Sequence, residues 1–327
     1  MDKGLTVLSL FDGISCGRIA LERAGIEVAK YYASEIKKIA IETTMLHYPD
    51  TIQIGDVTKV SYENGVLYTE KGQFEIGNVD LLIGGSPCQD FSILRAIGGH
   101  EITGLEGAKS KLFYEYLRLL SEVKPRFFLL ENVRMKRESE EQLNEYLGVK
   151  GIFINSILVS YQNRPRIYWT NIPNVVPPED RKINFQTFRE RDYQKQLPYK
   201  VNRTPNREKM WSNGAGRNQA GACANVTHSD HIQCITRKQD RFPNSGLIEF
   251  DGFCRYLTRE ELERGQTLPI GYTDNLTYNQ MQDVCGDCWT VDVISHIFRF
   301  AKPYIPQTRP ARSDELLGVT RNEISYL

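Results

Sequence analysis

The sequence predicts an α/β fold, with a doubly wound, mostly parallel sheet joined to a small irregular second domain. Three observations predict it. Runs typical of strands alternate with runs of helical spacing over the first 170 of 327 residues, which is the pattern of repeated strand–helix–strand units. Glycine-containing turns follow the ends of the first and fourth expected strands. After Thr170 the sequence becomes rich in Asn, Gln, Pro, Gly and Arg, and its periodicity weakens.

The expected elements follow one another along the chain. A strand over residues 5–10 runs into Phe11-Asp12-Gly13, and a helix over residues 14–24 ends at Gly25, a residue type that commonly terminates helices. Next come a strand over 28–34, a helix over 36–47, a strand over 51–54, a hairpin of 66–68 with 74–76, a buried strand over 79–83, a helix over 112–123 and a strand over 127–130. We expect residues 157–160 and 167–170 to form a further pair of strands, and helices to return over 258–265 and about 291–300.

The charges are distributed unevenly along the chain. Lys and Arg number 41 and Asp and Glu also number 41, so the formal net charge is zero. Residues 181–241 nevertheless hold thirteen basic and five acidic residues. A local basic excess is typical of a surface that contacts a polyanion. We therefore expect residues 171–251 to form a separate nucleic-acid-binding domain, and residues 1–170 with 252–327 to form the main domain.

Several classes of protein are excluded by composition. The longest apolar runs, such as residues 127–130, are far shorter than the roughly 20 residues that span a bilayer. The N-terminus lacks the features of a secretory signal, and the seven cysteines are an odd number scattered over the chain, which favours reduced thiols in a cytosol. The Cys and His spacings fit no paired structural-zinc pattern. We expect a cytoplasmic protein without a metal or a membrane partner.

Polar residues follow the first three expected strands, at the sheet edge where ligands bind in open parallel sheets. Phe11-Asp12-Gly13 and Gly17 open the first helix, and glycines there let a ligand approach backbone N–H groups. Glu35 ends the second strand, where a carboxylate can accept from ribose hydroxyls, and Asp56 ends the third, where it can accept from an exocyclic amine. Either acid could instead cap a helix. Together these features favour an adenosine-containing ligand.

Three further motifs are expected at the same edge. Cys88 lies on the glycine- and proline-rich loop 84–92 after a buried strand, a position that suits a nucleophile better than a core thiol. Glu131-Asn132-Val133 follows the next strand and presents a carboxyl that can act as an acid. Arg164 and Arg166 lie two positions apart at the start of another strand, where one can face the site and the other can support the scaffold.

The order of these motifs resembles one family. The motifs are Phe11-Asp12-Gly13, Glu35, Asp56-Val57, Ser86-Pro87-Cys88-Gln89, Glu131-Asn132-Val133, Gln162-x-Arg164-x-Arg166, Arg255-x-Leu257-Thr258, Gln266-x-Leu268-Pro269 and Gly286-Asp287-Cys288-Trp289. Together they resemble the DNA (cytosine-5) methyltransferase family over nearly the whole chain except about 175–230, and in detail the catalytic domains of its de novo-type members. The resemblance implies a class I, Rossmann-like methyltransferase domain with a target-recognition domain, in a compact enzyme of bacterial or phage type.

The resemblance also implies a reaction and a role for each catalytic residue. The methyl group of S-adenosylmethionine is transferred to carbon 5 of a cytosine that is flipped out of duplex DNA. Cys88 would add to carbon 6 of the ring, Glu131 would protonate or hydrogen-bond N3, and Arg166 would hold the O2 edge. Arg164 would support the loop.

Binding residues are implied in the same way. Cofactor contacts are expected at Phe11, Asp12, Gly13, Gly17, Glu35, Ile36, Asp56, Val57, Pro87 and Trp289, and DNA contacts at Ser86, Gln89, Ile93, Leu94, Arg237, Lys238 and Arg241. Arg237 is the candidate base-reading arginine, and the loop from Gln89 to about Lys109 would close over the site. One departure stands out, because Asp287-Cys288 replaces the usual Asn-Ser pair beside the methionine part of the cofactor.

The implied partners are double-stranded DNA and a cognate restriction endonuclease, for a monomer associated with the nucleoid of a bacterial or phage-infected cell. Three alternatives remain. A tRNA cytosine-5 methyltransferase shares this catalytic core, although the Cys-Phe-Thr signature of that branch is absent. A catalytically inactive DNA-binding homologue would tend to lose the cysteine, glutamate and arginines that are present. A thiol oxidoreductase would need a second cysteine close to Cys88 in sequence.

Overall fold

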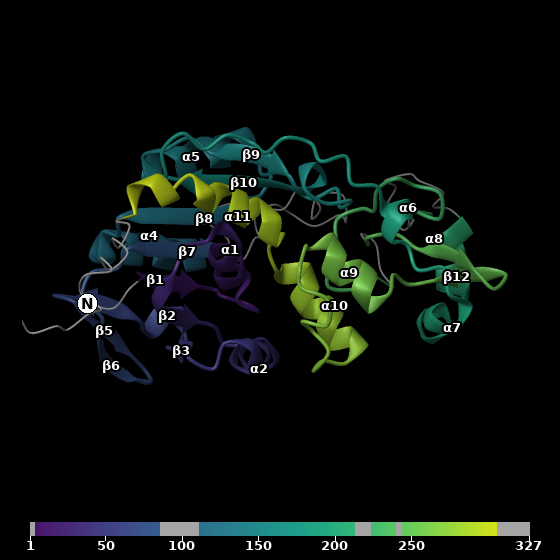
Figure 1. Cartoon of the computed structure of the whole chain (residues 1–327), viewed down its shortest axis with the longest axis horizontal. Coiled ribbons are helices and arrows are strands. Elements are labelled where there is room, and N and C mark those ends of the chain that lie inside the picture. The colour runs from purple at the N-terminus through teal and green to yellow at the C-terminus, as the bar shows by residue number, and fades with distance from the viewer. Residues whose placement is uncertain (1–3, 86–110, 213–223, 240–243, 306–327) are drawn as a thin grey trace, which may run out of the picture.

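A seven-stranded sheet forms the centre of one half of the molecule in the computed structural model, which describes residues 4–85, 111–212, 224–239 and 244–305 (Figure 1). The strand order is β3-β2-β1-β7-β8-β10-β9. The strands are β1 (Leu5–Leu10), β2 (Val28–Ser34), β3 (Ile52–Gln53), β7 (Leu81–Gly85), β8 (Phe127–Val133), β9 (Ile152–Asn155) and β10 (Pro165–Thr170). The first five in this order pair in parallel, and β10 is antiparallel to both neighbours. The chain builds outward from β1 in both directions, so the predicted doubly wound, mostly parallel fold is confirmed.

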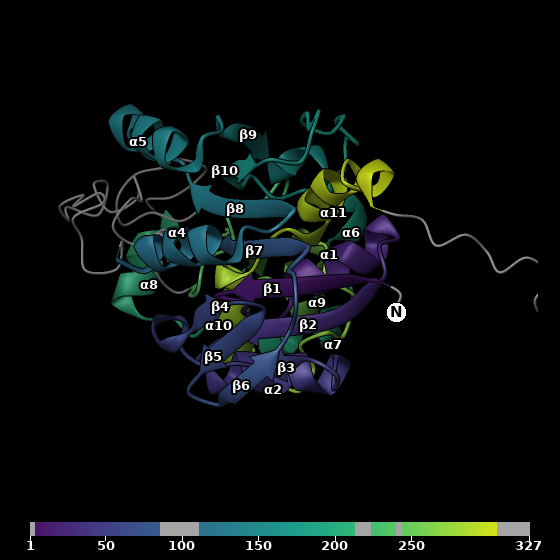
Figure 2. The same cartoon turned by 90° about the vertical axis from the view of Figure 1, so that its left-hand side faces the viewer.

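Helices cover both faces of this sheet (Figure 2). Residues adjacent along β1 point to opposite faces. Val7 packs in the core with α1 (Cys16–Ala24) and α11 (Val291–Arg299), whereas Leu8 packs in the core with α4 (Lys111–Val123) and α5 (Arg137–Leu147). Burial on both faces explains why β1 and β7 contain no charged residue and consist mostly of apolar ones. A further helix of this half, α2 (Lys38–His47), follows β2.

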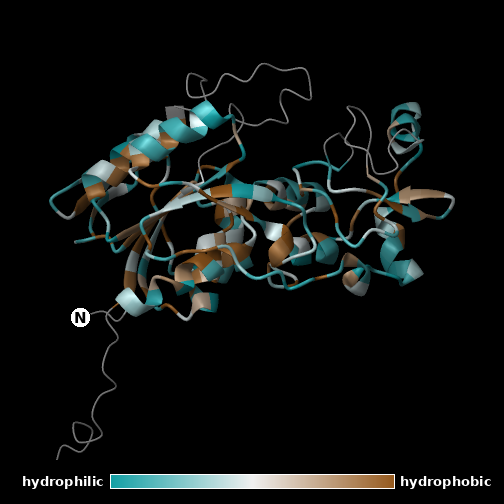
Figure 3. Cartoon of the chain, turned by 90° about the horizontal axis from the view of Figure 1, so that it is seen from above, coloured by the Kyte–Doolittle hydropathy of each residue, from teal (hydrophilic) through white to brown (hydrophobic). Residues whose placement is uncertain are grey.

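The other half of the molecule consists of short elements around a small core. It contains α6 (Phe185–Phe188), α7 (Tyr193–Gln196), α8 (Pro205–Ser212), β11 (Ile248–Phe250) and β12 (Phe253–Arg255). In Figure 1, α9 (Arg259–Gly265) and α10 (Tyr278–Asp287) lie between this half and the sheet. Figure 3 shows hydrophobic strands inside the sheet half and largely hydrophilic helices at the far end of the other half. We call the two halves the sheet lobe and the distal lobe.

The structure corrects two details of the predicted elements. Residues 157–160 are not a strand, because β9 ends at Asn155, whose side chain accepts from the backbone N–H of Ile157 and begins the 3₁₀ turn η3 (Ser156–Leu158). The predicted hairpin is a three-stranded sheet, because β4 (Ser61–Glu63) joins β5 (Val66–Thr69) and β6 (Gly72–Glu75). Among the residues described, no helix is long and apolar enough to cross a membrane.

Candidate active site

The turn after β1 holds residues in an uncommon backbone conformation. Phe11 has a φ of 57° and Ser15 a φ of 56°, in a region that non-glycine residues rarely adopt and that recurs at functional sites. The carboxylate of Asp12 holds the turn by accepting from the hydroxyls of Ser9, at 2.6 Å, and of Tyr31, at 2.7 Å. Loss of solvent around Asp12 raises its pKa from 3.8 to about 6. The turn therefore stores strain while it presents the Phe11 ring at the sheet edge.

The two acids that follow β2 and β3 organise the neighbouring loops. Glu35 Oε2 accepts from the backbone N–H of Gly13, at 2.8 Å, and its Oε1 accepts from the N–H groups of Ile36 and Lys37, each at 2.8 Å. Asp56 caps the 3₁₀ turn η1 (Val57–Lys59), because its Oδ1 accepts from the backbone N–H of Thr58 at 2.9 Å. Asp56 thus has the capping role left open by the sequence, and both acids also line a cavity.

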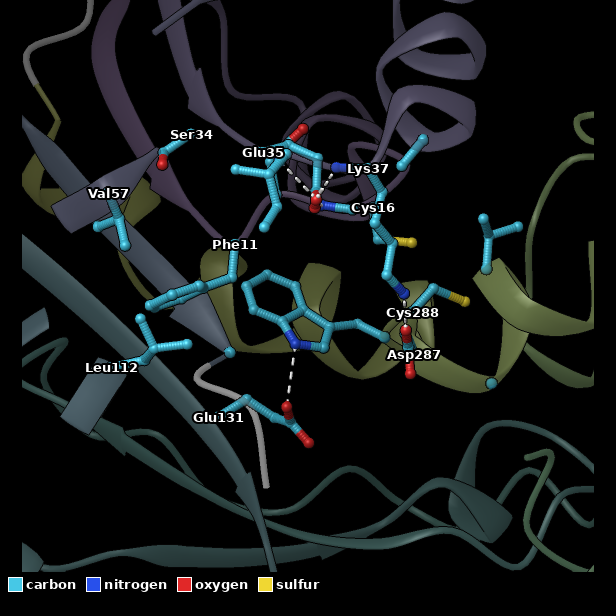
Figure 4. Close-up of a pocket in the computed structure, with 18 of the residues that line it drawn as sticks. Phe11, Cys16, Ser34, Glu35, Lys37, Val57, Leu112, Glu131, Asp287 and Cys288 are labelled. Atoms are coloured by element: carbon cyan, nitrogen blue, oxygen red, sulfur yellow. Dashed lines mark hydrogen bonds and ion pairs between the residues drawn. The ribbon is translucent and has the colours of Figure 1, made fainter. Parts of the chain in front are cut away.

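That cavity has a volume of about 290 Å³ and lies at the edge formed by the carboxyl ends of the parallel strands. Its two ends differ in character (Figure 4). Phe11, Val57 and Leu112 form an apolar end, whereas Lys37 and Asp287 lie at the other, with Glu35 between the two ends. A cavity with one apolar and one ionic end suits an elongated ligand whose two ends differ in the same way.

Glu131 lies at the cavity with two donors fixed on its carboxylate. Arg166 Nε donates to Oε1 at 2.8 Å, and the indole Nε1 of Trp289 donates to Oε2 at 3.1 Å (Figure 4). The antiparallel register pairs Arg166 with Val133, two residues beyond Glu131, which brings the side chains together. Gly85 makes room for this arrangement, since a Cβ atom there would lie 2.7 Å from Trp289 Nε1 and 3.1 Å from Glu131 Oε2.

Arg164 is buried, with 4% of its surface exposed. Its guanidinium links the start of β10 to two other backbone segments. Its Nη1 donates to the carbonyl of Ile235 at 2.9 Å, and its Nη2 donates to the carbonyls of Gly286 at 3.1 Å and Cys288 at 2.9 Å. The same guanidinium contacts the Cys234 sulfur at 3.4 Å. The pKa of the Cys234 thiol lies below its usual range, because the charges of Arg164 and its neighbour Arg166 outweigh the effect of burial.

The structure brings most of the sequence-predicted residues together. Those that line the cavity are Phe11, Asp12, Gly13, Glu35, Ile36, Asp56, Val57, Glu131, Arg164, Arg166, Arg237 and Trp289. Gly17 lies behind it, where a Cβ atom would meet Ile83 and Trp289, and Lys238 is exposed outside it. Ser86, Pro87, Cys88, Gln89, Ile93, Leu94 and Arg241 lie outside the described residues.

Some lining residues were not predicted. Lys37 lies at the ionic end of the cavity and Leu112 at the apolar end. Lys37 comes two positions after Glu35, and Leu112 is near the start of the helix that follows the Cys88 loop, so their positions relative to the motifs are the only signal in the sequence. No group of three or more His, Cys, Asp or Glu side chains that could hold a metal lies in the part of the chain that the structure describes.

Comparison with known proteins relates this site to a family. Residues 5–302 match the profile described as C-5 cytosine-specific DNA methylase. The orphan methyltransferase M.SPRI of Bacillus phage SPR is 31% identical over 196 residues, which cover 56% of this chain and 41% of that protein. The type II methyltransferase M.NgoBV of Neisseria gonorrhoeae is 30% identical over 185 residues, which cover 50% of this chain and 40% of that protein.

The fold is also similar to that of a solved methyltransferase structure. The methyltransferase EhMeth of Entamoeba histolytica superposes with a TM-score of 0.67 at 15% identity, covering 93% of this chain and 100% of that chain. At this identity the likeness establishes the fold alone. The chain spans about two fifths of the length of the two curated relatives. The family profile, in contrast, spans nearly the whole sequence, and the chain belongs to the C-5 cytosine-specific DNA methylase family.

Proposed function

We propose that this protein transfers the methyl group of S-adenosylmethionine to carbon 5 of a cytosine flipped out of duplex DNA. The observation that carries the proposal is the position of Glu131. Its carboxylate, held by Arg166 and Trp289, lines the same cavity as Phe11 and Val57. A group suited to the edge of a base and groups suited to an adenosine therefore share one cavity.

The residues of the cavity suit S-adenosylmethionine. Phe11 and Val57 offer apolar contact for adenine, and Asp56 beside them offers a carboxylate to an exocyclic amine. Glu35 lies between the ends, and its Oε2, which accepts one backbone N–H, that of Gly13, keeps acceptor capacity for a ligand hydroxyl. When bound, the cofactor would supply an electrophilic methyl group on a sulfonium sulfur.

The chain's own residues would prepare the cytosine for that group. The Cys88 thiolate forms a bond to carbon 6, and the electron pair displaced from the carbon 5–carbon 6 double bond is delocalised over the ring. Glu131 gives a proton to N3, which neutralises the charge, and Arg166 donates to O2 and keeps the Glu131 carboxyl in place. After methylation, water takes the proton from carbon 5, the carbon 5–carbon 6 double bond forms again and the Cys88 thiolate is expelled, while N3 returns its proton to the Glu131 carboxylate.

The DNA contacts would come from the basic part of the chain. Residues 181–241 carry thirteen basic and five acidic residues, and phosphate contacts of this kind supply most of the affinity for a duplex. We assign residues 171–251 as the target-recognition domain. Flipping the base out costs a few kcal/mol, which these contacts would offset. Arg237 and exposed Lys238 connect this region to the cavity.

We extend the proposal to the cellular setting. The protein would act as a monomer on nucleoid DNA in the cytoplasm of a bacterial or phage-infected cell. A type II methyltransferase and an orphan methyltransferase both occur among its relatives. The type II relative favours the presence of a cognate restriction endonuclease in the same cell, which would cut unmethylated copies of the same target.

The test is covalent trapping. The full chain is mixed with S-adenosylmethionine and a library of duplexes that carry 5-fluorocytosine, because fluorine at carbon 5 cannot leave as a proton and the adduct persists. We expect a denaturation-resistant adduct whose mass maps to Cys88, and no adduct with Cys88→Ser. Unmodified tRNA is run in parallel with radiolabelled cofactor. Methylation of tRNA alone, or an adduct that survives Cys88→Ser, would contradict the proposal.

A further inference from the structure

Three charged side chains meet at one end of the cavity. Asp287 Oδ1 accepts from Arg237 Nε at 2.7 Å, and Oδ2 accepts from Arg237 Nη2 at 2.6 Å. The ammonium of Lys37 donates to the same Oδ2. We call Lys37, Asp287 and Arg237 the ionic cluster. All three line the cavity, and Figure 4 shows Lys37 and Asp287 at the end opposite Phe11 and Val57.

The ionic cluster is built into the fold by close backbone packing. Its members come from the segment after β2, the last residue of α10 and the segment that follows Ile235. A Cβ atom on Gly286 would lie only 2.4 Å from the backbone nitrogen of Arg237, so a glycine is needed for these two segments to touch. Arg164, bound to the carbonyls of Ile235 and Gly286, joins the same segments from the buried side. The three charges are therefore held together by more than their own attraction.

The ionic cluster has one cation more than it has anions. Among the residues that the structure describes, one carboxylate faces an ammonium and a guanidinium, so the ionic cluster itself carries a net charge of +1. The two cations also hold the pKa of Asp287 below its usual range, so the carboxylate stays ionised at neutral pH. An ammonium has three N–H donors, and Asp287 occupies one of those of Lys37. The chemistry that this end favours is an anionic oxygen ligand.

We propose that Lys37 binds the carboxylate of the cofactor's amino-acid moiety, and that Asp287 positions the Lys37 ammonium for it. This inference rests on the proposed function, since it names the subsite of the same cavity that takes the non-nucleoside end of S-adenosylmethionine. The order of residues along the cavity matches the order of groups in that molecule. Phe11 and Val57 lie at one end, Glu35 between the ends and Lys37 at the other (Figure 4), where they would take the base, the ribose and the amino acid. Asp287 would thus act through Lys37.

Binding measurements with two ligands test this assignment. S-adenosylhomocysteine carries the amino-acid moiety, and 5′-methylthioadenosine lacks it but keeps the nucleoside. Their dissociation constants are measured by calorimetry for the wild-type chain, Lys37→Met, Lys37→Arg and the control Lys38→Met. Lys38 is the matched control because its ammonium, 87% exposed, lies 3.6 Å from Glu42 on the same helix.

We expect Lys37→Met to weaken S-adenosylhomocysteine binding about tenfold or more and 5′-methylthioadenosine binding less than about twofold, because only the first ligand has a carboxylate. Lys37→Arg should retain most of the affinity, and Lys38→Met should change neither ligand. Asp287→Asn should weaken the first ligand selectively in wild type and have little further effect in Lys37→Met.

Each contrary result has a definite meaning. An equal loss for both ligands would mean that Lys37 only maintains the shape of the cavity, and unchanged binding in Lys37→Met would mean that the carboxylate lies elsewhere. Either result overturns the assignment while the proposed function stands. A wild-type chain that binds neither ligand would overturn both.

Discussion

The two lobes use buried polar groups for different purposes. In the sheet lobe, two large apolar clusters cover the two faces of the sheet, and the polar groups at the strand ends gather around the cavity. In the distal lobe the separate apolar cluster has five buried members, among them Val201 and Phe253. The distal lobe also buries a charged side chain, that of Arg255. This residue is 0% exposed and does not line the cavity. The polar groups at the strand ends of the sheet lobe thus form the site, whereas Arg255 and its partners stabilise the fold of the distal lobe.

The centre of the distal network is Arg255. Its Nη1 and Nη2 donate to the two carboxylate oxygens of Glu261, each at 2.8 Å, and its Nε donates to Gln196 at 2.8 Å. Glu261 is also the capping-box residue of α9, so it bonds the backbone N–H of Thr258. One ion pair therefore joins β12, α7 and the start of α9.

Arg255→Met should cause the largest effect on stability. It leaves the Glu261 charge buried without its main partner, which costs about 3–5 kcal/mol of the free energy of unfolding. Urea denaturation of the full chain measures it. The double variant Arg255→Met/Glu261→Met should recover much of the loss, because a buried ion pair can be replaced by apolar groups at little cost. A loss below about 1 kcal/mol in the single variant would contradict the role given to this pair.

Glu131→Gln should instead lower catalytic activity far more than it lowers stability. The variant keeps the shape of the side chain but cannot alternate between the carboxylic acid that gives N3 a proton and the carboxylate that pairs with Arg166, so we expect kcat to fall by about 100-fold or more. Affinity for S-adenosylhomocysteine should change little, and the free energy of unfolding should fall by less than in Arg255→Met, because the side chains of Arg166 and Glu131 are 12% and 11% exposed whereas those of Arg255 and Glu261 are 0% and 1% exposed. Steady-state methylation kinetics and calorimetry measure the three quantities. Glu138→Gln, an exposed glutamate on α5, is the control and should match wild type in each. A near-normal kcat in Glu131→Gln would contradict the catalytic role given to the polar groups of the sheet lobe.

The same contrast explains what could be predicted from the sequence. In a parallel sheet the carboxyl ends of the strands share one edge, so Glu35, Asp56 and Glu131 could be grouped without knowing any contact. The apolar runs that identify β1 and β7 are buried on both faces and leave a strong pattern. Both features belong to the sheet lobe, where burial and sequence period agree.

Contacts between polar residues that are far apart in the sequence leave no periodic pattern from which they could be predicted. Lys37 and Asp287 are 250 positions apart, and only the folded chain joins them. The turn at Ser156–Leu158 is set by the side chain of one residue, Asn155, which overrides an apolar run that is otherwise typical of a strand. In the distal lobe, α7 has one buried residue, Gln196, so a helical period of apolar residues is absent.

Replacing Asp12 tests whether the turn after β1, which forms part of the site, lowers the free energy of unfolding at neutral pH. Its folded pKa of about 6 lies above the ordinary value of 3.8. Between these pH values the folded chain holds a proton that the unfolded chain has lost, so the free energy of unfolding contributed by this group is greatest below about pH 4 and falls as pH rises through 6. Replacement by asparagine removes the titration. We expect the stability of Asp12→Asn relative to wild type to rise by about 1–2 kcal/mol between pH 4 and pH 7.

Asp50 provides the control with the opposite sign. Arg18 lowers its pKa, so its stabilising contribution is present above the unfolded pKa and is lost as pH falls. The stability of Asp50→Asn relative to wild type should therefore decrease, by a smaller amount because this carboxyl is largely exposed, as pH rises from 3 to 5. Denaturation at a series of pH values measures both differences. If Asp12→Asn and Asp50→Asn shifted in the same direction, the raised pKa of Asp12 would be wrong, and the turn after β1 would cost the fold nothing beyond its backbone strain.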